Sequence, residues 1–216
     1  MKTIFLSDFD GTMTKKDFYH IVIDDWIGEA GRNYMIDYQK KKPLDYHFLN
    51  DIFSMKPMSA AEYQSLVKMI EPDSFFKEFV ESLRQSEIDI TIISAGCLPY
   101  IKDTLAILGL ESVPVITNES TLQEGTLTIT PDESSPFFAE PFGIDKASVV
   151  RHFKQNYDRV IFAGDSFPDL GAAKEADLVF ATGPLQSILY EEGIPFIPFS
   201  NFAQVLEHLN NEVAKK

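Results

Sequence analysis

The stretch Lys2-Thr3-Ile4-Phe5-Leu6-Ser7-Asp8-Phe9-Asp10-Gly11-Thr12 joins a short apolar run to a polar loop that contains glycine. A contiguous apolar run bounded by a turn signal is typical of a strand that is buried on both faces, as in a parallel sheet. Two more runs have this form: residues 88–93 lead into Ser94-Ala95-Gly96, and residues 159–163 lead into Gly164-Asp165-Ser166. We therefore expect three parallel strands, each followed by a polar loop.

Helical patterns alternate with these strands along the chain. In the helix predicted over residues 74–85, Phe75, Phe76, Phe79, Val80 and Leu83 follow a helical spacing. The other predicted helices cover residues 99–108, 145–155, 169–175, 185–192 and 202–213, and two weaker strands are predicted at 178–181 and 194–199. Alternating strands and helices predict an α/β fold, with a doubly wound, Rossmann-like parallel sheet as its core.

Two segments interrupt this alternation. Residues 14–73 contain amphipathic stretches and no good strand, which predicts a small helical cap inserted after the first strand. The core would then comprise residues 1–13 and 74–216. Residues 113–117 and 126–130 flank the turn-prone Gln123-Glu124-Gly125 and predict a β-hairpin, followed by a loop over residues 131–143.

The charge of the chain argues against several classes of partner. The 216 residues include 19 Lys and Arg against 33 Asp and Glu, a net charge of −14, which disfavours nucleic acid or an anionic membrane as the main partner. Cys97 is the only cysteine, so neither an internal disulfide nor a multi-thiolate metal site is possible. We expect a cytoplasmic protein, because the N-terminus lacks the pattern of a signal peptide and no apolar run is long enough for a membrane span. We further expect it to be a monomer or a homodimer.

The polar loops after the strands belong at one edge of the sheet. In an open α/β sheet, ligands bind at the carboxyl ends of the strands, so we expect these loops to form one site. It would bring together Asp8, Asp10, Thr12, Ser94, Ala95, Gly96, Lys146, Asp165 and Asp169.

Several carboxylates in one cleft require a counter-charge. Like charges about 4 Å apart repel by about 4 kcal/mol at an effective dielectric constant of 20, and a hard divalent cation removes this repulsion. Oxygen ligands without His or Cys favour Mg²⁺, so Asp8, Asp10, Asp165 and Asp169 are the predicted metal residues. Lys146 and the hydroxyl and backbone groups of Thr12, Ser94, Ala95 and Gly96 would bind a substrate phosphate.

The four segments resemble, in order and placement, the four motifs of the haloacid dehalogenase superfamily. They are Asp8-Phe9-Asp10-Gly11-Thr12, Ile93-Ser94-Ala95-Gly96, Lys146 and Gly164-Asp165-Ser166-Phe167-Pro168-Asp169. The helical insert stands where that superfamily has a C1 cap. The resemblance implies a phosphoric monoester hydrolase that uses Mg²⁺ and acts on a small phosphorylated metabolite.

The resemblance also implies a role for each matched residue. Asp8 would attack phosphorus and become an aspartyl-phosphate, and Asp10 would protonate the leaving alcohol and then activate water. The carbonyl of Asp10 would reach the Mg²⁺, and Thr12 would orient Asp10. Asp165 would bind Mg²⁺ directly, with Asp169 either a ligand or a partner of the ligands. An acid two residues after the nucleophile favours phosphoryl transfer over dehalogenation, because a halide needs no proton.

Two groups with a C1 cap are the most similar to this sequence. One dephosphorylates phosphoserine, and the other acts on 2-hydroxy-3-keto-5-methylthiopentenyl-1-phosphate in methionine salvage. Both have an acid seven residues after the second Asp of the first motif, where Asp17 stands here as a predicted specificity residue of the cap. The salvage group resembles the chain further in having Asp at this position. Arg32, the only arginine of the insert, lies well before the region that grips the phosphoserine carboxylate.

Three other classes of protein remain open on the sequence alone. A phosphomutase shares the chemistry but returns the phosphoryl group to a sugar. A phospho-accepting receiver domain uses similar chemistry but places its acceptor on a central strand after an earlier acidic pair. A protein that binds phosphometabolites without turnover would carry the same residues. Finally, the aromatic residues of the insert either form its own core or contact the substrate: Phe18, Tyr19, Trp26, Tyr34, Tyr38, Tyr46, Phe48 and Phe53.

Overall fold

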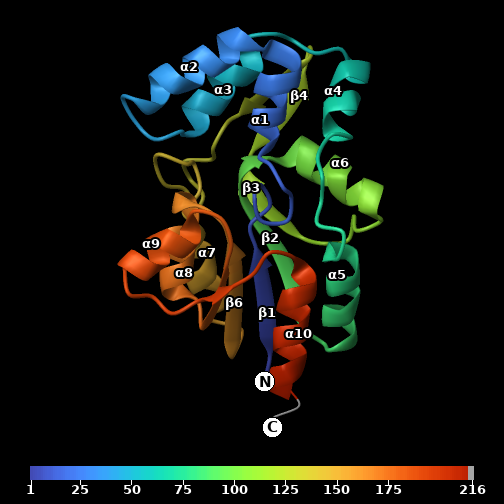
Figure 1. Cartoon of the computed structure of the whole chain (residues 1–216), viewed down its shortest axis with the longest axis vertical. Helices are drawn as coiled ribbons and strands as arrows, with labels where there is room; N and C mark the ends of the chain where they lie inside the picture. Colours follow the sequence, from blue (N-terminus) through green and yellow to red (C-terminus); the bar gives the residue numbers. More distant parts are fainter. Residues whose placement is uncertain (214–216) are drawn as a thin grey trace.

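The computed structural model describes residues 1–213 and contains a six-stranded parallel sheet with the strand order β3-β2-β1-β6-β7-β8 (Figure 1). The first strand lies inside the sheet and the next two along the chain lie on one side of it. The strands are β1 (Thr3–Ser7), β2 (Asp89–Cys97), β3 (Val115–Asn118), β6 (Arg159–Gly164), β7 (Leu178–Ala181) and β8 (Ile197–Pro198). The prediction of an α/β, doubly wound parallel sheet is confirmed.

Helices cover both faces of this sheet (Figure 1). One group packs with the apolar cluster around Phe5: α5 (Phe76–Gln85), α6 (Leu98–Leu108) and α10 (Phe202–Val213). The other group packs with the cluster around Leu6: α7 (Lys146–Phe153), α8 (Leu170–Glu175) and α9 (Leu185–Glu191). Phe5 and Leu6 therefore point to opposite faces of a strand that is buried throughout. Among residues 1–213, no helix is long and apolar enough to span a bilayer.

Aromatic contacts hold α5 and α10 against the central strand. The ring of Phe5 meets that of Phe79 edge to face at a centroid distance of 4.8 Å, and Phe79 lies 4.9 Å from Phe202. Edge-to-face aromatic pairs are stabilised beyond the apolar area that they bury. The first apolar run of the sequence is thus the centre around which the helices of this face assemble.

The strand register brings the polar loops to one level at the carboxyl edge. Ser7 of β1 lies beside Ile92 of β2 on one side and beside Ala163 of β6 on the other. The backbone amide of Asp8 donates to the carbonyl of Ala163 at 2.9 Å, so the pairing continues one residue beyond β1. The loops that follow β1 and β6 therefore begin side by side, next to the last residues of β2.

A helical segment follows β1 and lies beyond the carboxyl edge of the sheet (Figure 1). It contains α1 (Phe18–Ile21), the π-helical turn η1 (Val22–Ile27), α2 (Glu29–Gln39), α3 (Tyr46–Ser54) and α4 (Ala60–Val67). The chain enters and leaves this segment at adjacent points, because Thr14 and Pro72 form an antiparallel bridge. The division into a core of residues 1–13 and 74–216 and a cap of 14–73 stays a prediction.

The predicted end of the second strand was wrong. Ser94-Ala95-Gly96 was expected to be a loop, but β2 continues through it to Cys97. The physical reason is pairing with β3, which follows β2 as far as Asn118 and is irregular in register between Ser94 and Cys97. Hydrogen bonds to β3 satisfy backbone groups that a loop would expose to water.

The predicted hairpin was wrong in its first arm. Residues 115–118 join the parallel sheet as β3, and the hairpin consists of β4 (Ser120–Gln123) and β5 (Thr126–Ile129). Glu124 and Gly125 have φ angles of 48° and 79°, as a two-residue hairpin turn with two left-handed residues requires. The turn was placed correctly, but the apolar run before it pairs with β2 instead.

The hairpin packs against the helical segment. The Asn50 side chain of α3 donates to the carbonyl of Ile129 at 2.9 Å and accepts from the amide of Ile129 at 2.7 Å. At the turn, the amide of Met58 donates to the carbonyl of Gly125 at 2.7 Å. These bonds to the hairpin backbone hold α3 in place, and α3 lines the cavity described below.

Candidate active site

A buried lysine lies between two aspartates at the carboxyl edge of the sheet. The Nζ atom of Lys146 is 2.6 Å from Oδ1 of Asp8 and 2.6 Å from Oδ1 of Asp169. Lys146 is the first residue of α7, and Asp145 begins that helix by accepting a hydrogen bond from the amide of Ala147. The three charged side chains come from three separate segments, so their burial and pairing connect those segments.

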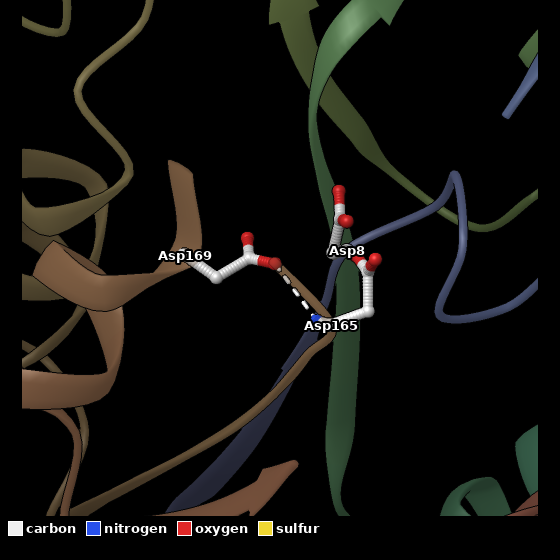
Figure 2. Close-up of side chains that lie close together, drawn as sticks. All are labelled: Asp8, Asp165 and Asp169. Carbon is white, nitrogen blue, oxygen red and sulfur yellow. Dashed lines mark hydrogen bonds between the residues drawn. The ribbon is translucent and has the colours of Figure 1, made fainter. Parts of the chain in front are cut away.

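Asp169 also shapes the loop after β6. Its Oδ2 atom accepts hydrogen bonds from the amides of Asp165 at 2.9 Å and Ser166 at 3.2 Å, and Figure 2 shows its carboxylate directed at the Asp165 backbone. A Cβ atom at Gly164 would lie 2.7 Å from the Asp169 carboxyl carbon. The sequence has glycine there because any side chain would displace Asp169.

Three carboxylates lie together and could hold a metal ion. Asp8, Asp165 and Asp169 each offer one oxygen, and these oxygens lie within 4.8 Å of one another. In Figure 2 the carboxylates of Asp8 and Asp165 are neighbours, while that of Asp169 approaches from the other side of the Asp165 backbone. The donor set consists of oxygen atoms alone, as a hard divalent cation requires.

The electrostatics of this cluster favour a cation. Burial, followed by the charge of Asp169, raises the pKa of Asp165 to about 7. Burial and the charge of Asp169 also raise the pKa of Asp8 well above its usual value, although Lys146 opposes this. For Lys146, burial lowers the pKa, but Asp169 and Asp8 together outweigh burial and raise it. One ammonium therefore compensates only part of the carboxylate charge.

Asp10 points away from these three carboxylates. Its Oδ1 atom accepts from the amide of Phe18 at 2.9 Å, and its Oδ2 atom accepts from the Tyr100 hydroxyl at 2.6 Å. Burial and the nearby charge of Asp17 raise the pKa of Asp10 to about 8. The two acids of the Asp-x-Asp motif therefore have different surroundings, Asp8 beside a lysine and Asp10 between two neutral donors.

The other predicted phosphate residues occupy two places. Ser94, Ala95 and Gly96 line the cavity, and the Ser94 hydroxyl accepts a hydrogen bond from the amide of Gly96 at 3.0 Å. Thr12 does not line it; the Thr12 hydroxyl lies 3.3 Å from Asp165 Oδ1 and 3.5 Å from Asp8 Oδ2, and it donates its one proton to either oxygen. The structure thus places Thr12 among the carboxylates.

A cavity of about 390 Å³ lies between the sheet edge and the helical segment. Polar residues from the core reach it at one end, and apolar side chains cover much of the rest. Residues that the sequence reasoning named here are Asp8, Asp10, Asp17, Ser94, Ala95, Gly96 and Lys146. The residues that it did not single out include Gln39, Leu44, Leu49, Tyr100, Phe142, Phe167 and Pro168.

The aromatic residues of the helical segment divide between core and cavity. Tyr19, Tyr46 and Phe53 line the cavity. Phe18 and Phe48 are fully buried in the apolar core. The core alternative is therefore confirmed for Phe18 and Phe48, and contact with the substrate stays a prediction for Tyr19, Tyr46 and Phe53.

The lining of the cavity contains more acidic than basic side chains. Among its described lining residues, Lys146 is the only cation, whereas Asp8, Asp10, Asp17 and Asp45 are acids. Burial raises the pKa of Asp17. Arg32 is exposed, does not line the cavity, and pairs with Asp24 at 3.2 Å. This surface suits a ligand whose negative charge is confined to the end that meets Lys146.

The sheet, the helical segment after β1 and the carboxylate–lysine cluster define the class of haloacid dehalogenase-like hydrolases. The model of that family, described as haloacid dehalogenase-like hydrolase, matches residues 5–174 of the chain. The chain therefore belongs to this family, and it is a phosphatase of the family. The prediction of the superfamily, made from four short motifs, is confirmed.

The named relatives are distant but similar over almost their whole length. The polyol phosphate phosphatase PYP1 of Saccharomyces cerevisiae is 26% identical over 99% of this chain and 95% of that protein. The 2-hydroxy-3-keto-5-methylthiopentenyl-1-phosphate phosphatase of Brevibacillus brevis is 27% identical over 96% of this chain and 95% of that protein.

A solved structure confirms the fold. A phospho-aspartyl intermediate analogue of phosphoserine phosphatase has a TM-score of 0.71 and 19% identity, covering 96% of this chain and 98% of that chain. The whole described arrangement, including the helical segment after β1, is thus similar to a known fold.

The carboxylate cluster predicts how pH and metal affect stability. Because the pKa of Asp165 is raised to about 7 in the folded protein, its favourable contribution is fully present below its usual pKa of 3.8 and is lost as the pH rises through about 7. The metal-free protein should therefore melt at a higher temperature at about pH 5 than at about pH 8. Mg²⁺ should raise the melting temperature more at the higher pH, where protons compete less.

Asp165→Asn is the matched control for this measurement. It removes the titrating carboxyl, so both the pH dependence and the response to Mg²⁺ should shrink. A melting temperature of the unmodified chain that is constant between these two pH values, with an equal response to Mg²⁺ at both, would contradict the analysis.

Proposed function

We propose that the chain is a Mg²⁺-dependent phosphomonoester hydrolase that acts on a small phosphorylated metabolite. The observation that carries this proposal is the buried ammonium of Lys146, 2.6 Å from Asp8, at the sheet edge where Ser94 and Asp165 also lie. A phosphate bound there would contact a nucleophile, a cation and a hydroxyl together.

The reaction proceeds in two displacements. An oxygen of Asp8 attacks phosphorus, the bond to the leaving oxygen breaks, and Asp10 gives its proton to that oxygen. Asp10 then takes a proton from water as the water oxygen attacks phosphorus. The bond between phosphorus and the Asp8 oxygen breaks, which regenerates the Asp8 carboxylate and releases inorganic phosphate. Lys146 and the Ser94 hydroxyl bind the phosphoryl oxygens and stabilise the charge that develops on them.

Asp8, Asp165 and the backbone carbonyl of Asp10 would hold the Mg²⁺. The ion, when bound, neutralises phosphoryl and carboxylate charge. In this proposal Asp169 is not a ligand of the ion but holds Lys146 and the loop after β6 in place, because its two oxygens accept hydrogen bonds from Lys146 and from the amides of Asp165 and Ser166. Thr12 holds Asp8 and Asp165 side by side through its hydroxyl.

The cavity favours a leaving alcohol without a charge of its own. Phosphoserine carries an ammonium group, which would suit Asp17 or Asp45, but also a carboxylate. Lys146, the only cation among the described lining residues, binds the phosphate in this proposal, so the carboxylate would have no cationic partner. Leu49, Phe53 and the rings of neighbouring loops suit an apolar group. We therefore propose 2-hydroxy-3-keto-5-methylthiopentenyl-1-phosphate as the first candidate substrate, as the distant relative of that name also suggests.

A polyol phosphate is the second candidate. Asp17, Tyr19 and Gln39 line the same cavity and offer hydrogen bonds to hydroxyl groups. The relative named as a polyol phosphate phosphatase is as similar to the chain as the salvage relative. Both candidates share an uncharged leaving alcohol, and the composition of the cavity supports this shared property.

Replacement of Asp8 tests the proposed reaction. With Mg²⁺, the unmodified chain should release inorganic phosphate from p-nitrophenyl phosphate, and Asp8→Asn should lower kcat by about 10³-fold or more because the nucleophile is lost. Asp37→Asn, an exposed residue of α2 paired with Lys40, is the matched control and should leave kcat unchanged. Turnover by Asp8→Asn at the rate of the unmodified chain would show that the nucleophile lies elsewhere. No turnover by the unmodified chain would favour a protein that only binds phosphometabolites.

Comparison of three substrates tests the proposed specificity. The kcat/KM for the salvage substrate or for a polyol phosphate should exceed that for phosphoserine by about 100-fold or more, because burying an unpaired carboxylate near like charges costs several kcal/mol. The measurement is phosphate release at substrate concentrations well below KM. A higher kcat/KM for phosphoserine than for either uncharged alcohol would overturn the proposed specificity and leave the proposed reaction intact.

A further inference from the structure

Tyr100 contacts the predicted acid–base residue although no sequence motif contains it. It lies in the first turn of α6, directly after the end of β2, and only 3% of its surface is exposed. Its hydroxyl donates to Oδ2 of Asp10 at 2.6 Å, and its side chain reaches the cavity. The hydroxyl therefore touches a carboxyl that lines the cavity.

The Tyr100 ring is fixed from two sides. The ring of Phe18 stacks on it at a centroid distance of 4.4 Å and an angle of 25°, and the ring of Phe9 lies 5.9 Å away. The amide of Phe18 also donates to Oδ1 of Asp10 at 2.9 Å. Phe18 and Tyr100 thus hold one oxygen each of the same carboxyl group and pack against each other.

Gly96 provides the space for this contact. A Cβ atom at Gly96 would lie 1.9 Å from the Tyr100 hydroxyl and 3.0 Å from Asp10 Oδ2. Any side chain at this position would separate the two groups. The glycine that was predicted to bind phosphate is therefore also required by the hydrogen bond between Tyr100 and Asp10.

We propose that Tyr100 is a positioning residue for Asp10, which it orients so that the carboxyl proton is directed at the leaving oxygen of the substrate. This inference rests on the proposed function, in which Asp10 protonates that oxygen. As the bond between phosphorus and the leaving oxygen breaks, the proton moves from Asp10 to that oxygen, and Tyr100 keeps its own proton. Burial and the charge of Asp10 raise the pKa of Tyr100 well above its usual value, in keeping with a permanent donor.

Tyr100→Phe tests this role, because it removes the hydroxyl and keeps the ring that stacks on Phe18. For glycerol phosphate, whose alkoxide is a strong base, kcat/KM should fall about 10-fold or more when the acid is misaligned. For p-nitrophenyl phosphate, whose leaving group needs little protonation, it should fall less than about threefold. The parameter kcat/KM reports the steps up to departure of the alcohol, so the later attack by water does not enter.

The ratio of the two kcat/KM values is the decisive quantity. Both substrates are assayed on one preparation, so partial unfolding of the variant cancels in the ratio. A decrease limited to glycerol phosphate supports the positioning role. An equal decrease for both substrates, or no decrease for either, overturns it. Tyr157→Phe is the matched control: its hydroxyl donates to Asp89 at 2.7 Å, at the opposite end of β2, and its loss should leave the ratio unchanged.

Asp10→Asn distinguishes a failure of the proposed role of Tyr100 from a failure of the proposed role of Asp10. It should show the same selective loss as Tyr100→Phe, and a larger one. A selective loss in Asp10→Asn with none in Tyr100→Phe overturns only the role of Tyr100. A loss in Asp10→Asn that is equal for both substrates removes the acid from the proposed function, and the role of Tyr100 with it.

Discussion

The ammonium group of Lys146, buried between Asp8 and Asp169, is the interaction on which the site depends. Removing charges from water costs several kcal/mol for each ion, and a buried pair recovers this cost only with close geometry and further hydrogen bonds. Asp169 meets this condition by also accepting from the amides of Asp165 and Ser166. The lysine thereby ties together the loop after β1, the start of α7 and the loop after β6.

The same interaction leaves the site with unbalanced charge, and this imbalance explains what it binds. One ammonium stands against the cluster of Asp8, Asp165 and Asp169, and in the proposed function a divalent cation would balance the remaining charge and bind oxygens of the phosphate. The part of the cavity away from Lys146 does not require a cation or a phosphate, because it is lined by aliphatic and aromatic side chains with a few acids. In the proposed function, the charged end of the cavity binds the phosphate and the remainder accepts an uncharged alcohol.

Much of the core could be predicted because its signals are local. Apolar runs such as residues 2–7, ending in aspartates, indicate buried parallel strands, and parallel strands bring their carboxyl ends to one edge. The aspartates of the first and fourth motifs follow such runs, whereas Lys146 was assigned from its place at the start of a predicted helix and from the family resemblance. Asp8, Lys146, Asp165 and Asp169 do lie together in the structure, and Thr12 accompanies them.

Other features depend on contacts that no short pattern encodes. The sequence of residues 115–118 fits a hairpin arm and a strand of the sheet equally well. In the structure these residues pair with the edge of β2, which a local pattern cannot predict. The apolar lining comes from α3, the loop before it, the loop over residues 131–143 and the turn at Phe167–Asp169, whose packing on the cavity is tertiary. Tyr100 could have been found from the sequence. It lies four residues after Gly96, in the first turn of α6, and the first turn of a helix that follows a strand lies at the same edge of the sheet.

The central claim is that the carboxylate paired with Lys146 accepts the phosphoryl group. The most direct test is mass spectrometry of the chain, quenched in acid during turnover and digested with a protease. A peptide that contains both Asp8 and Asp10 should carry one added phosphoryl group, located on Asp8 by fragmentation and absent from the Asp8→Asn variant. A phosphoryl group on Asp10 or on any other residue would contradict the account.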